Sequence, residues 1–194
     1  MSNYYGPLPY SLSLFTAELP YLTIVSILFV TVEYWLVGWS SKFGDYIFFM
    51  VVFYLYTSTC TFVGQWMSVL TPNPKVANVA VGALSCLFNL FGGYLLPNPQ
   101  MEGFYQWIQY IMPSYYSLGG LVGVQLGDCK GDSYGCRMVD LGNGTKTQVS
   151  EWIKKEYNFH PEAKVGFLFA LVGFWVFTQV MIYLTLKYVS HLKR

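Results

Sequence analysis

The chain has 194 residues, of which 54% are hydrophobic, 20% aromatic and 11% charged, and its formal net charge is +1. Because a soluble domain carries about a quarter charged residues to keep its surface hydrated, this composition indicates an integral membrane protein. No basic stripe interleaved with aromatic residues occurs, which argues against nucleic acid as a partner.

The sequence contains four apolar segments that are long enough to cross a bilayer, which takes about 20 helical residues. We expect these spans at residues 19–39, 46–67, 76–96 and 165–186. The first helix is expected to begin at residues 17–21. Glu18 suits a first turn, because the exposed amides there carry partial positive charge. Pro20 suits it too, because the amide hydrogen that proline lacks would have no helical partner in a first turn. The preceding segment is interrupted by Pro7 and Pro9 and is not counted as a span.

A re-entrant hairpin is expected between the third and fourth spans, at residues 104–124. Pro113 divides this apolar stretch, and each half is too short to cross a bilayer. Backbone that leaves a helix at membrane depth needs other protein or a water-filled cavity to satisfy its free polar groups, so the hairpin predicts an enclosed space. Counting the stretch as a fifth span would place Met1 outside, and we favour four spans plus a hairpin.

The longest polar segment, residues 127–164, is predicted to be an external loop. It holds Cys129 and Cys136, which can form a disulfide on an oxidising side, and Asn143 begins the only Asn-x-Ser/Thr glycosylation acceptor in the chain. Two free thiols and a chance acceptor are the alternative, but the coincidence of the two signals favours the external side. Cations at residues 187–194 place the C-terminus in the cytosol, and four spans return the N-terminus to the same side.

Small and polar residues form a stripe along the third span. They recur at spacings of three and four and therefore share one helical face: Asn78, Gly82, Ser85, Cys86 and Asn89. A polar stripe on an apolar helix is expected to face protein or water. Ordinary helix packing is the better explanation for any one of these residues, whereas the stripe as a whole favours a lined pathway. The small residues around Ser58 in the second span indicate close helix packing instead.

Three motifs follow one another along the chain: Ala17-Glu18-Leu19-Pro20-Tyr21, then Phe91-Gly92-Gly93-Tyr94-Leu95-Leu96-Pro97, then Trp107-Ile108-Gln109-Tyr110-Ile111-Met112-Pro113-Ser114-Tyr115-Tyr116. In this order and spacing the chain resembles the membrane domain of G-subfamily ATP-binding-cassette exporters, particularly the pleiotropic drug resistance type. In that family the motifs open the third of six spans, close the fifth, and mark a re-entrant hairpin before a large external loop. The resemblance covers nearly the whole chain and implies an all-α integral membrane fold with a disulfide-bearing external loop.

The resemblance also implies roles for individual residues. Tyr94 and Leu95 would form a hydrophobic plug that closes a substrate cavity toward the external exit. The cavity would be faced by small or polar residues of the third span and flanked by one aromatic residue: Ser85, Cys86, Asn89 and Phe88. Glu18 would lie at the cytosolic end of its span, where the family's coupling elements meet the nucleotide-binding domain.

The chain departs from the full pattern of the family. It contains no G-x-x-x-x-G-K-[ST] phosphate loop, and the family's nucleotide-binding domain and first two spans have no counterpart in it. We therefore expect the C-terminal part of a longer transporter, or a truncated product, that holds no cofactor and is no ATPase by itself. ATP and Mg²⁺ would bind a separate nucleotide-binding domain. That domain, a second membrane domain, the lipid bilayer and a hydrophobic small-molecule or lipid substrate are the implied partners, and the implied location is the plasma membrane.

Taken together, these features predict a portion of an exporter's membrane domain that moves hydrophobic or amphipathic compounds. A small membrane scaffold or accessory subunit without a transport pathway is the alternative. A membrane enzyme is less favoured, because the only histidines, His160 and His191, lie on opposite sides in this topology and no acid or base accompanies a serine at membrane depth.

Overall fold

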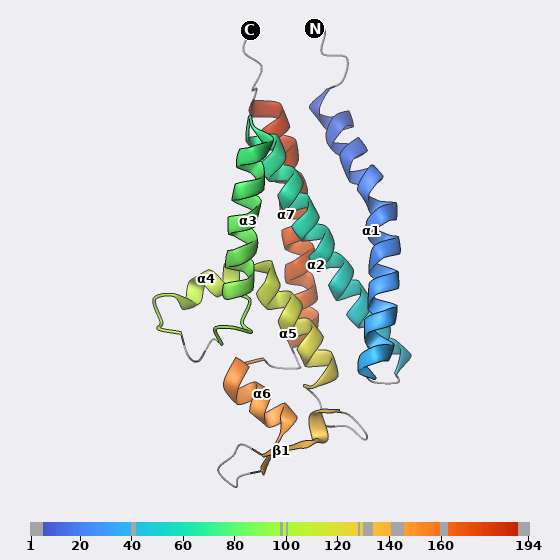
Figure 1. The fold of residues 1–194 in the computed structure, drawn as a ribbon, viewed down its shortest axis with the longest axis vertical. Helices are drawn as coiled ribbons and strands as arrows, with labels where there is room; N and C mark the ends of the chain where they lie inside the picture. The colour runs from blue at the N-terminus through green and yellow to red at the C-terminus, as the bar shows by residue number, and fades with distance from the viewer. Residues whose placement is uncertain are drawn as a thin grey trace.

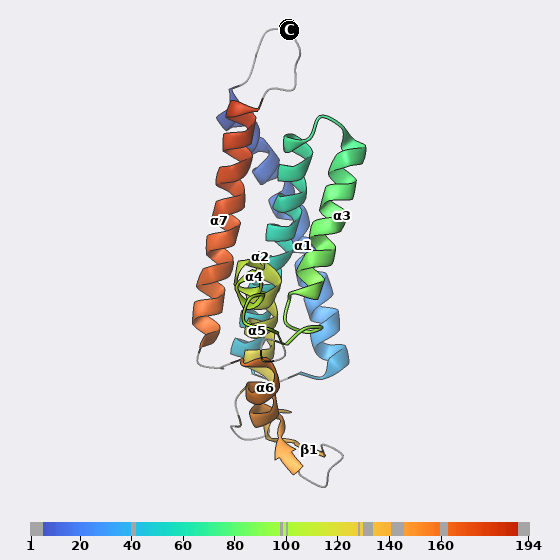
Figure 2. The ribbon, with the colours of Figure 1, turned by 90° about the vertical axis from the view of Figure 1, so that its left-hand side faces the viewer.

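The computed structural model of the chain describes residues 6–39, 42–97, 99, 101–127, 129, 134–140, 146–159 and 163–189. In chain order, the elements are α1 (Pro7–Val37), α2 (Phe43–Leu70), α3 (Pro74–Leu90), α4 (Gln106–Ile111), α5 (Pro113–Gln125), the 3-10 helix η2 (Tyr134–Cys136), β1 (Met138–Asp140), β2 (Lys146–Gln148), α6 (Val149–Tyr157) and α7 (Lys164–Tyr188). Figures 1 and 2 show α1, α2, α3 and α7 as an elongated bundle, with α6 and β1 beyond one end.

α2 is the central helix of the bundle, since α1, α3, α5 and α7 all pack against it. Its buried positions combine large apolar residues with small polar ones: Phe49, Val52, Ser58, Thr59 and Phe62. Ser58 and Thr59 donate hydrogen bonds to the carbonyl of Leu55 in their own helix, so their hydroxyls are satisfied while neighbouring helices approach closely. The close packing predicted around Ser58 is confirmed at Ser58 and Thr59, whereas Thr61 and Gly64 farther along α2 line a pocket.

Three of the described helices, α1, α2 and α7, are long and apolar enough to cross a membrane. Leu22, Phe62 and Ile182, one from each helix, form a buried cluster that joins them. A hydrogen bond of 3.0 Å from Nε1 of Trp66 to Oγ1 of Thr185 ties α2 to α7. The mostly helical fold and these apolar helices agree with the predicted all-α membrane domain.

The start of α1 corrects the expected start of the first helix, because α1 begins at Pro7 rather than at residues 17–21. Pro7 and Pro9 lie in the first turn, where amide hydrogens have no helical partner, so neither proline interrupts the helix. Pro20 lies inside α1 even though it cannot donate a backbone hydrogen bond. Glu18 consequently lies within α1, about 16 Å along the axis from Pro7 at 1.5 Å per residue.

α3 ends at Leu90, before residue 96, the expected end of the third span. Its 17 residues extend about 25 Å, less than the roughly 30 Å of a bilayer's hydrocarbon core. Bent backbone follows, in which Gly93 has a φ of 92°, a conformation that suits glycine because it has no Cβ atom. Farther along, α4 and α5 meet at Met112, whose extended backbone confirms the helix break predicted at Pro113.

The described part of the segment between α5 and α7 lies at the opposite end of the bundle from the start of α1 and the end of α7 (Figure 1). It contains the predicted disulfide between Cys129 and Cys136. β1 and β2 form an antiparallel pair that was not predicted. α6 buries Ile153 in a cluster with residues of α5, so this segment packs onto the bundle. Asn143, the predicted glycosylation site, lies outside the described residues.

Candidate functional site along α3

α3 presents three different faces. One face packs against α2 and α5 and carries buried Ala77 and half-buried Phe88. A second face is exposed and apolar, and it carries Val79, which is 75% exposed, together with Leu87 and Leu90. The third face carries the polar stripe, and all of its members are exposed: Asn78, Gly82, Ser85, Cys86 and Asn89. Lipid can therefore cover the apolar second face, whereas the polar third face needs hydrogen-bonding neighbours.

The polar stripe needs a cover other than hydrocarbon. A polar group that faces lipid without a hydrogen-bond partner is costly, because no water is present to replace the lost bond. Asn89 satisfies part of this need by donating from Nδ2 to the carbonyl of Ser85 at 2.8 Å. No other helix covers the stripe in the described part of the chain. We therefore expect water or another protein domain against this face.

The stripe begins beside a pocket of about 490 Å³ between α1, α2 and α3. Several of its lining residues are small or polar: Thr61, Gly64, Gln65, Ser68 and Asn78. Tyr10, Leu14, Val69 and Val81 complete the lining. Gln65 donates from Nε2 to Oε1 of Glu18 at 3.1 Å, which links α2 to α1 beside the pocket. The other polar atom of Gln65, Oε1, is buried without a hydrogen-bond partner. This upper pocket therefore lies beside a polar contact between α1 and α2, near the start of the stripe.

The stripe ends beside a second pocket, of about 240 Å³, between α2, α3 and α5. The residues that line this lower pocket are Phe53, Tyr56, Phe88, Asn89, Gly92, Tyr94, Ser114, Ser117, Leu118 and Leu121. Asn78 lines the upper pocket and Asn89 the lower one, and they lie about 16 Å apart along the helix axis. The polar stripe thus connects two pockets at different depths of the bundle.

The structure divides the predicted site residues into two groups. Three of them line the lower pocket together: Phe88, Asn89 and Tyr94. Ser85 and Cys86 lie on the stripe between the two pockets and line neither of them. Tyr94 is 69% exposed and Leu95 is 57% exposed, on the bent segment that follows α3. Lining residues from α2 and α5, such as Tyr56 and Ser117, were not predicted, because each lies in an apolar segment and only the fold brings it to the pocket.

The bent segment after α3 is held by α4 and α5. Oγ of Ser114 donates to the carbonyl of Phe88 at 2.6 Å, and Nε2 of Gln109 donates to the carbonyl of Leu96 at 3.5 Å. Gly92 permits this approach, because a Cβ atom there would lie 2.8 Å from the carbonyl oxygen of Phe88 and 3.1 Å from Oγ of Ser114. We call these two hydrogen bonds the hairpin latch. The first bond holds the last turn of α3, just before the segment that carries the predicted plug, and the second holds Leu96 near the end of that segment.

Residues 1–126 match the family described as ABC-2 type transporter. The chain belongs to the ABC-2 type transporter family. The matched region contains α1 to α5, so the polar stripe, both pockets beside it and the hairpin latch all lie within the ABC-2 membrane domain.

Curated relatives of this ABC-2 chain are plant ABC G-family transporters. ABC transporter G family member 35 of Arabidopsis thaliana is 31% identical over 173 residues, which cover 89% of this chain and 12% of the relative. ABC transporter G family member 53 of Oryza sativa subsp. japonica is 29% identical over 196 residues, covering 100% of this chain and 13% of the relative. Pleiotropic drug resistance protein 1 of Nicotiana tabacum is 27% identical over 124 residues, which cover 64% of this chain and 9% of the relative. The family resemblance is confirmed, and the chain spans 9% to 13% of the length of these relatives.

Removing one bond of the hairpin latch is expected to loosen the segment after α3. Ser114→Ala deletes a hydrogen bond worth about 1 kcal/mol, so amide exchange at residues 92–96 should become about fivefold faster. Hydrogen exchange followed by mass spectrometry measures this rate. Ser85→Ala, on the exposed stripe of α3, is the matched control and should leave the rate unchanged. Equal exchange in the two variants would show that the latch does not hold this segment.

Proposed function

We propose that this chain forms the membrane-embedded portion of an ATP-driven exporter of hydrophobic or amphipathic compounds. The observation that carries the proposal is the uncovered polar stripe of α3, which joins two pockets and ends beside exposed Tyr94. Such a stripe suits a substrate path, because apolar walls with a few polar groups are typical of sites for small molecules. Membership of the ABC-2 family and the similarity to G-family and pleiotropic drug resistance relatives support the assignment.

The proposed exporter requires partners that supply energy and complete the path. A nucleotide-binding domain would bind ATP and Mg²⁺ and hydrolyse the nucleotide, while this chain would hold no cofactor. A second membrane domain, in the same longer chain or in a dimer, would face the polar stripe. The exposure of the stripe supports this arrangement, because the facing domain and the water between them would satisfy the polar groups.

The proposed plug consists of Tyr94 and Leu95. Both side chains are more than half exposed at the end of the stripe, on the segment that the hairpin latch fixes. Closure of the nucleotide-binding domains would push a substrate out of the cavity that Ser85, Cys86 and Asn89 face, and then past the plug. Between transport events, the two large side chains would keep water and ions from crossing.

Glu18 is proposed to act in coupling from within its helix. Its hydrogen bond to Gln65 joins α1 to α2 beside the upper pocket, so a displacement of α1 would reach a pocket wall directly. Because α1 extends for several turns before Glu18, the coupling contact would be made by the side of the helix rather than by its end.

We also propose four spans and a re-entrant hairpin formed by α4 and α5, in the plasma membrane. α3 and the bent segment through Leu96 would together make the third span. Both termini would be cytosolic and residues 127–164 external, with Asn143 open to glycosylation. The disulfide between Cys129 and Cys136 supports an oxidising environment for this loop. Figure 2 likewise has α6 and β1 at the end of the bundle opposite the C-terminal end of α7.

Cysteine labelling separates the exporter from a scaffold or accessory subunit. In a background with Cys60→Ala and Cys86→Ala, we expect Ser85→Cys and Asn89→Cys to react with a water-soluble maleimide in the membrane-embedded transporter. Leu90→Cys is the matched control on the apolar face and should stay unlabelled, because lipid covers it. Protection at all three positions would mean that the stripe is packed against protein and would favour the scaffold.

Replacing the plug tests the gate. In the complete transporter in proteoliposomes, the double variant Tyr94→Ala and Leu95→Ala should retain ATP hydrolysis but export less substrate per ATP, because a wider constriction lets substrate return. Simultaneous assays of phosphate release and substrate flux measure this ratio. Phe104→Ala, another exposed aromatic residue but outside the pockets beside α3, serves as control and should keep the ratio of the wild type. An unchanged ratio in the double variant would remove the gate assignment.

A further inference from the structure

The upper pocket, between α1, α2 and α3, has a polar wall that α2 provides. Thr61 and Ser68 are seven positions apart, which is about two helical turns, so their hydroxyl groups lie on one face of α2. Thr61 is half-buried and Ser68 is exposed, and both line this pocket of about 490 Å³. Asn78 of α3 lines it too. A molecule in the pocket therefore meets polar side chains from two helices.

The hydroxyl hydrogens of this wall are already used within α2. Oγ1 of Thr61 donates to the carbonyl of Thr57 at 3.0 Å. Oγ of Ser68 donates to the carbonyl of Gly64, also at 3.0 Å. A hydroxyl has one hydrogen to donate and two lone pairs that accept. Both hydroxyls therefore offer acceptors to a molecule in the pocket, and they can donate to it only by giving up a bond within the helix.

The lower pocket repeats this arrangement. Oγ of Ser114, which lines it, donates to the carbonyl of Phe88 at 2.6 Å. Asn89, which also lines it, uses one amide hydrogen on the carbonyl of Ser85 at 2.8 Å and keeps its side-chain oxygen as an acceptor. Hydrogen-bond acceptors therefore lie at both ends of the polar stripe.

The surroundings of the upper pocket also favour a hydrogen-bond donor. Tyr10, Leu14 and Glu18 follow one another at spacings of four on one face of α1, and the first two line the pocket. Glu18 lies one turn beyond them, where Nε2 of Gln65 donates to its carboxyl group at 3.1 Å. None of the described residues that line the pocket carries a basic side chain. A polar group that donates therefore fits better here than one that only accepts.

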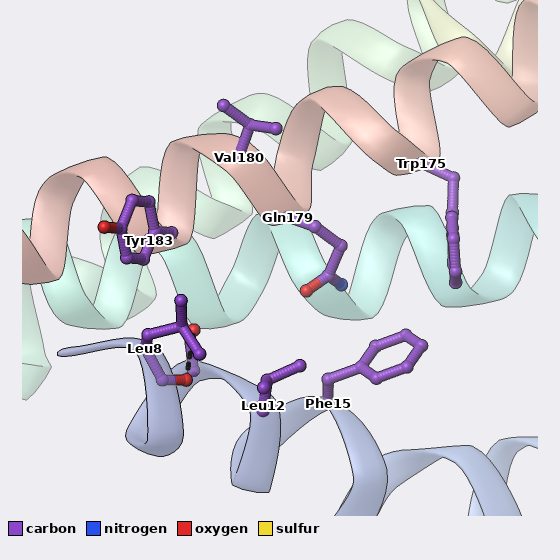
Figure 3. A pocket seen from close by; sticks show the side chains of 8 residues that line it. Leu8, Leu12, Phe15, Trp175, Gln179, Val180 and Tyr183 are labelled. Atoms are coloured by element: carbon purple, nitrogen blue, oxygen red, sulfur yellow. Dashed lines mark hydrogen bonds between the residues drawn. The ribbon is translucent and has the colours of Figure 1, made fainter. Parts of the chain in front are cut away.

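A third pocket, of about 480 Å³ between α1 and α7, has a different lining. Figure 3 shows Leu12 and Phe15 of α1 pointing toward Trp175 and Gln179 of α7. Nε1 of Trp175 and Nε2 of Gln179 are buried, so a molecule in this space does not reach them. Leucine, phenylalanine and valine side chains supply much of the lining. This space therefore offers mostly apolar contacts and does not repeat the wall of acceptors.

We propose that the upper pocket selects amphipathic compounds whose polar end donates hydrogen bonds, such as alcohols, amides and amines. The donor bonds to Thr61 or Ser68, and the apolar part packs against the leucine and valine side chains of the lining. The volume lies within the range of about 300–1,000 Å³ that is typical of small-molecule pockets. A polar end that only accepts must displace a hydroxyl from its helix bond, which lowers its affinity about fivefold. This inference rests on the proposed function, because it names the class of compound that the same path exports.

Fluorenol and its methyl ether test the selection, because they share the same rings and only the alcohol can donate. In the complete transporter in nanodiscs, with Cys60→Ala and Cys86→Ala, Val81→Cys places a thiol in the upper pocket for a water-soluble maleimide. We expect the alcohol to slow labelling of this thiol at about one-fifth of the concentration that the ether needs. Phe104→Cys, which lines none of the three pockets, should be labelled at one rate with either compound. Equal protection by both compounds, or protection by neither, would overturn the proposal.

A double variant tests whether the two hydroxyls cause the preference. Thr61→Val with Ser68→Ala keeps side chains of similar size but removes both acceptors, so alcohol and ether should protect the thiol at equal concentrations. Thr23→Val is the matched control, because Oγ1 of Thr23 donates to the carbonyl of Leu19 at 2.7 Å but Thr23 does not line the pocket. The control should keep the fivefold preference. A preference that survives in the double variant would contradict the proposal.

Flux measurements separate this inference from the proposed function. ATP-driven export of fluorenol and its ether from proteoliposomes is compared under the same conditions. Export of both compounds with no preference for the alcohol would overturn the selection and leave the exporter assignment in place. Protection of the pocket by the alcohol, with no ATP-driven flux of either compound, would support the selection and count against export along α3.

Discussion

Polar groups inside a bilayer need hydrogen-bond partners, and the rest of this structure depends on how that need is met. Most hydroxyl groups within the long helices bond to their own backbone, as Thr16 does to the carbonyl of Leu12 at 2.8 Å. Others join neighbouring helices, as Thr31 and Tyr46 do at 2.8 Å between α1 and α2. The stripe of α3 departs from this pattern, since its polar side chains are exposed. We therefore expect this exposed polar face of α3 to meet water or protein beyond the described residues.

The bundle packs tightly around α2 and loosely around α3. α2 is buried among α1, α5 and α7, whereas Ala77 is the buried residue of α3. The segment that carries Tyr94 is held near its end by Gln109 of α4, and Ser114 of α5 bonds to the last turn of α3 just before it. Segments with few buried contacts open at lower free energy than a core does. A gate placed here can move while the contacts around α2 remain intact.

Local patterns predicted most of the helices, because long apolar runs and the proline at 113 are signals that a few neighbouring residues carry. The predicted start of α1 was wrong, because the sequence does not show which proline lies in the first turn of the helix, Pro7 or Pro20. The strands β1 and β2 were missed because three-residue strands show little periodicity. The spacing of the stripe residues was enough to predict that they share one helical face. Tyr56 and Ser117, which line the lower pocket with Asn89, come from helices distant in sequence, and no local pattern predicts such contacts.

The most direct test of a pathway along α3 is a cryo-EM structure of the complete transporter in nanodiscs, at a resolution that distinguishes lipid from water and protein. A pathway predicts a water-filled cavity against Ser85 and Asn89, with a second membrane domain on its far side, and acyl chains against Val79 and Leu90. Ordered acyl chains along Ser85 and Asn89 would contradict it.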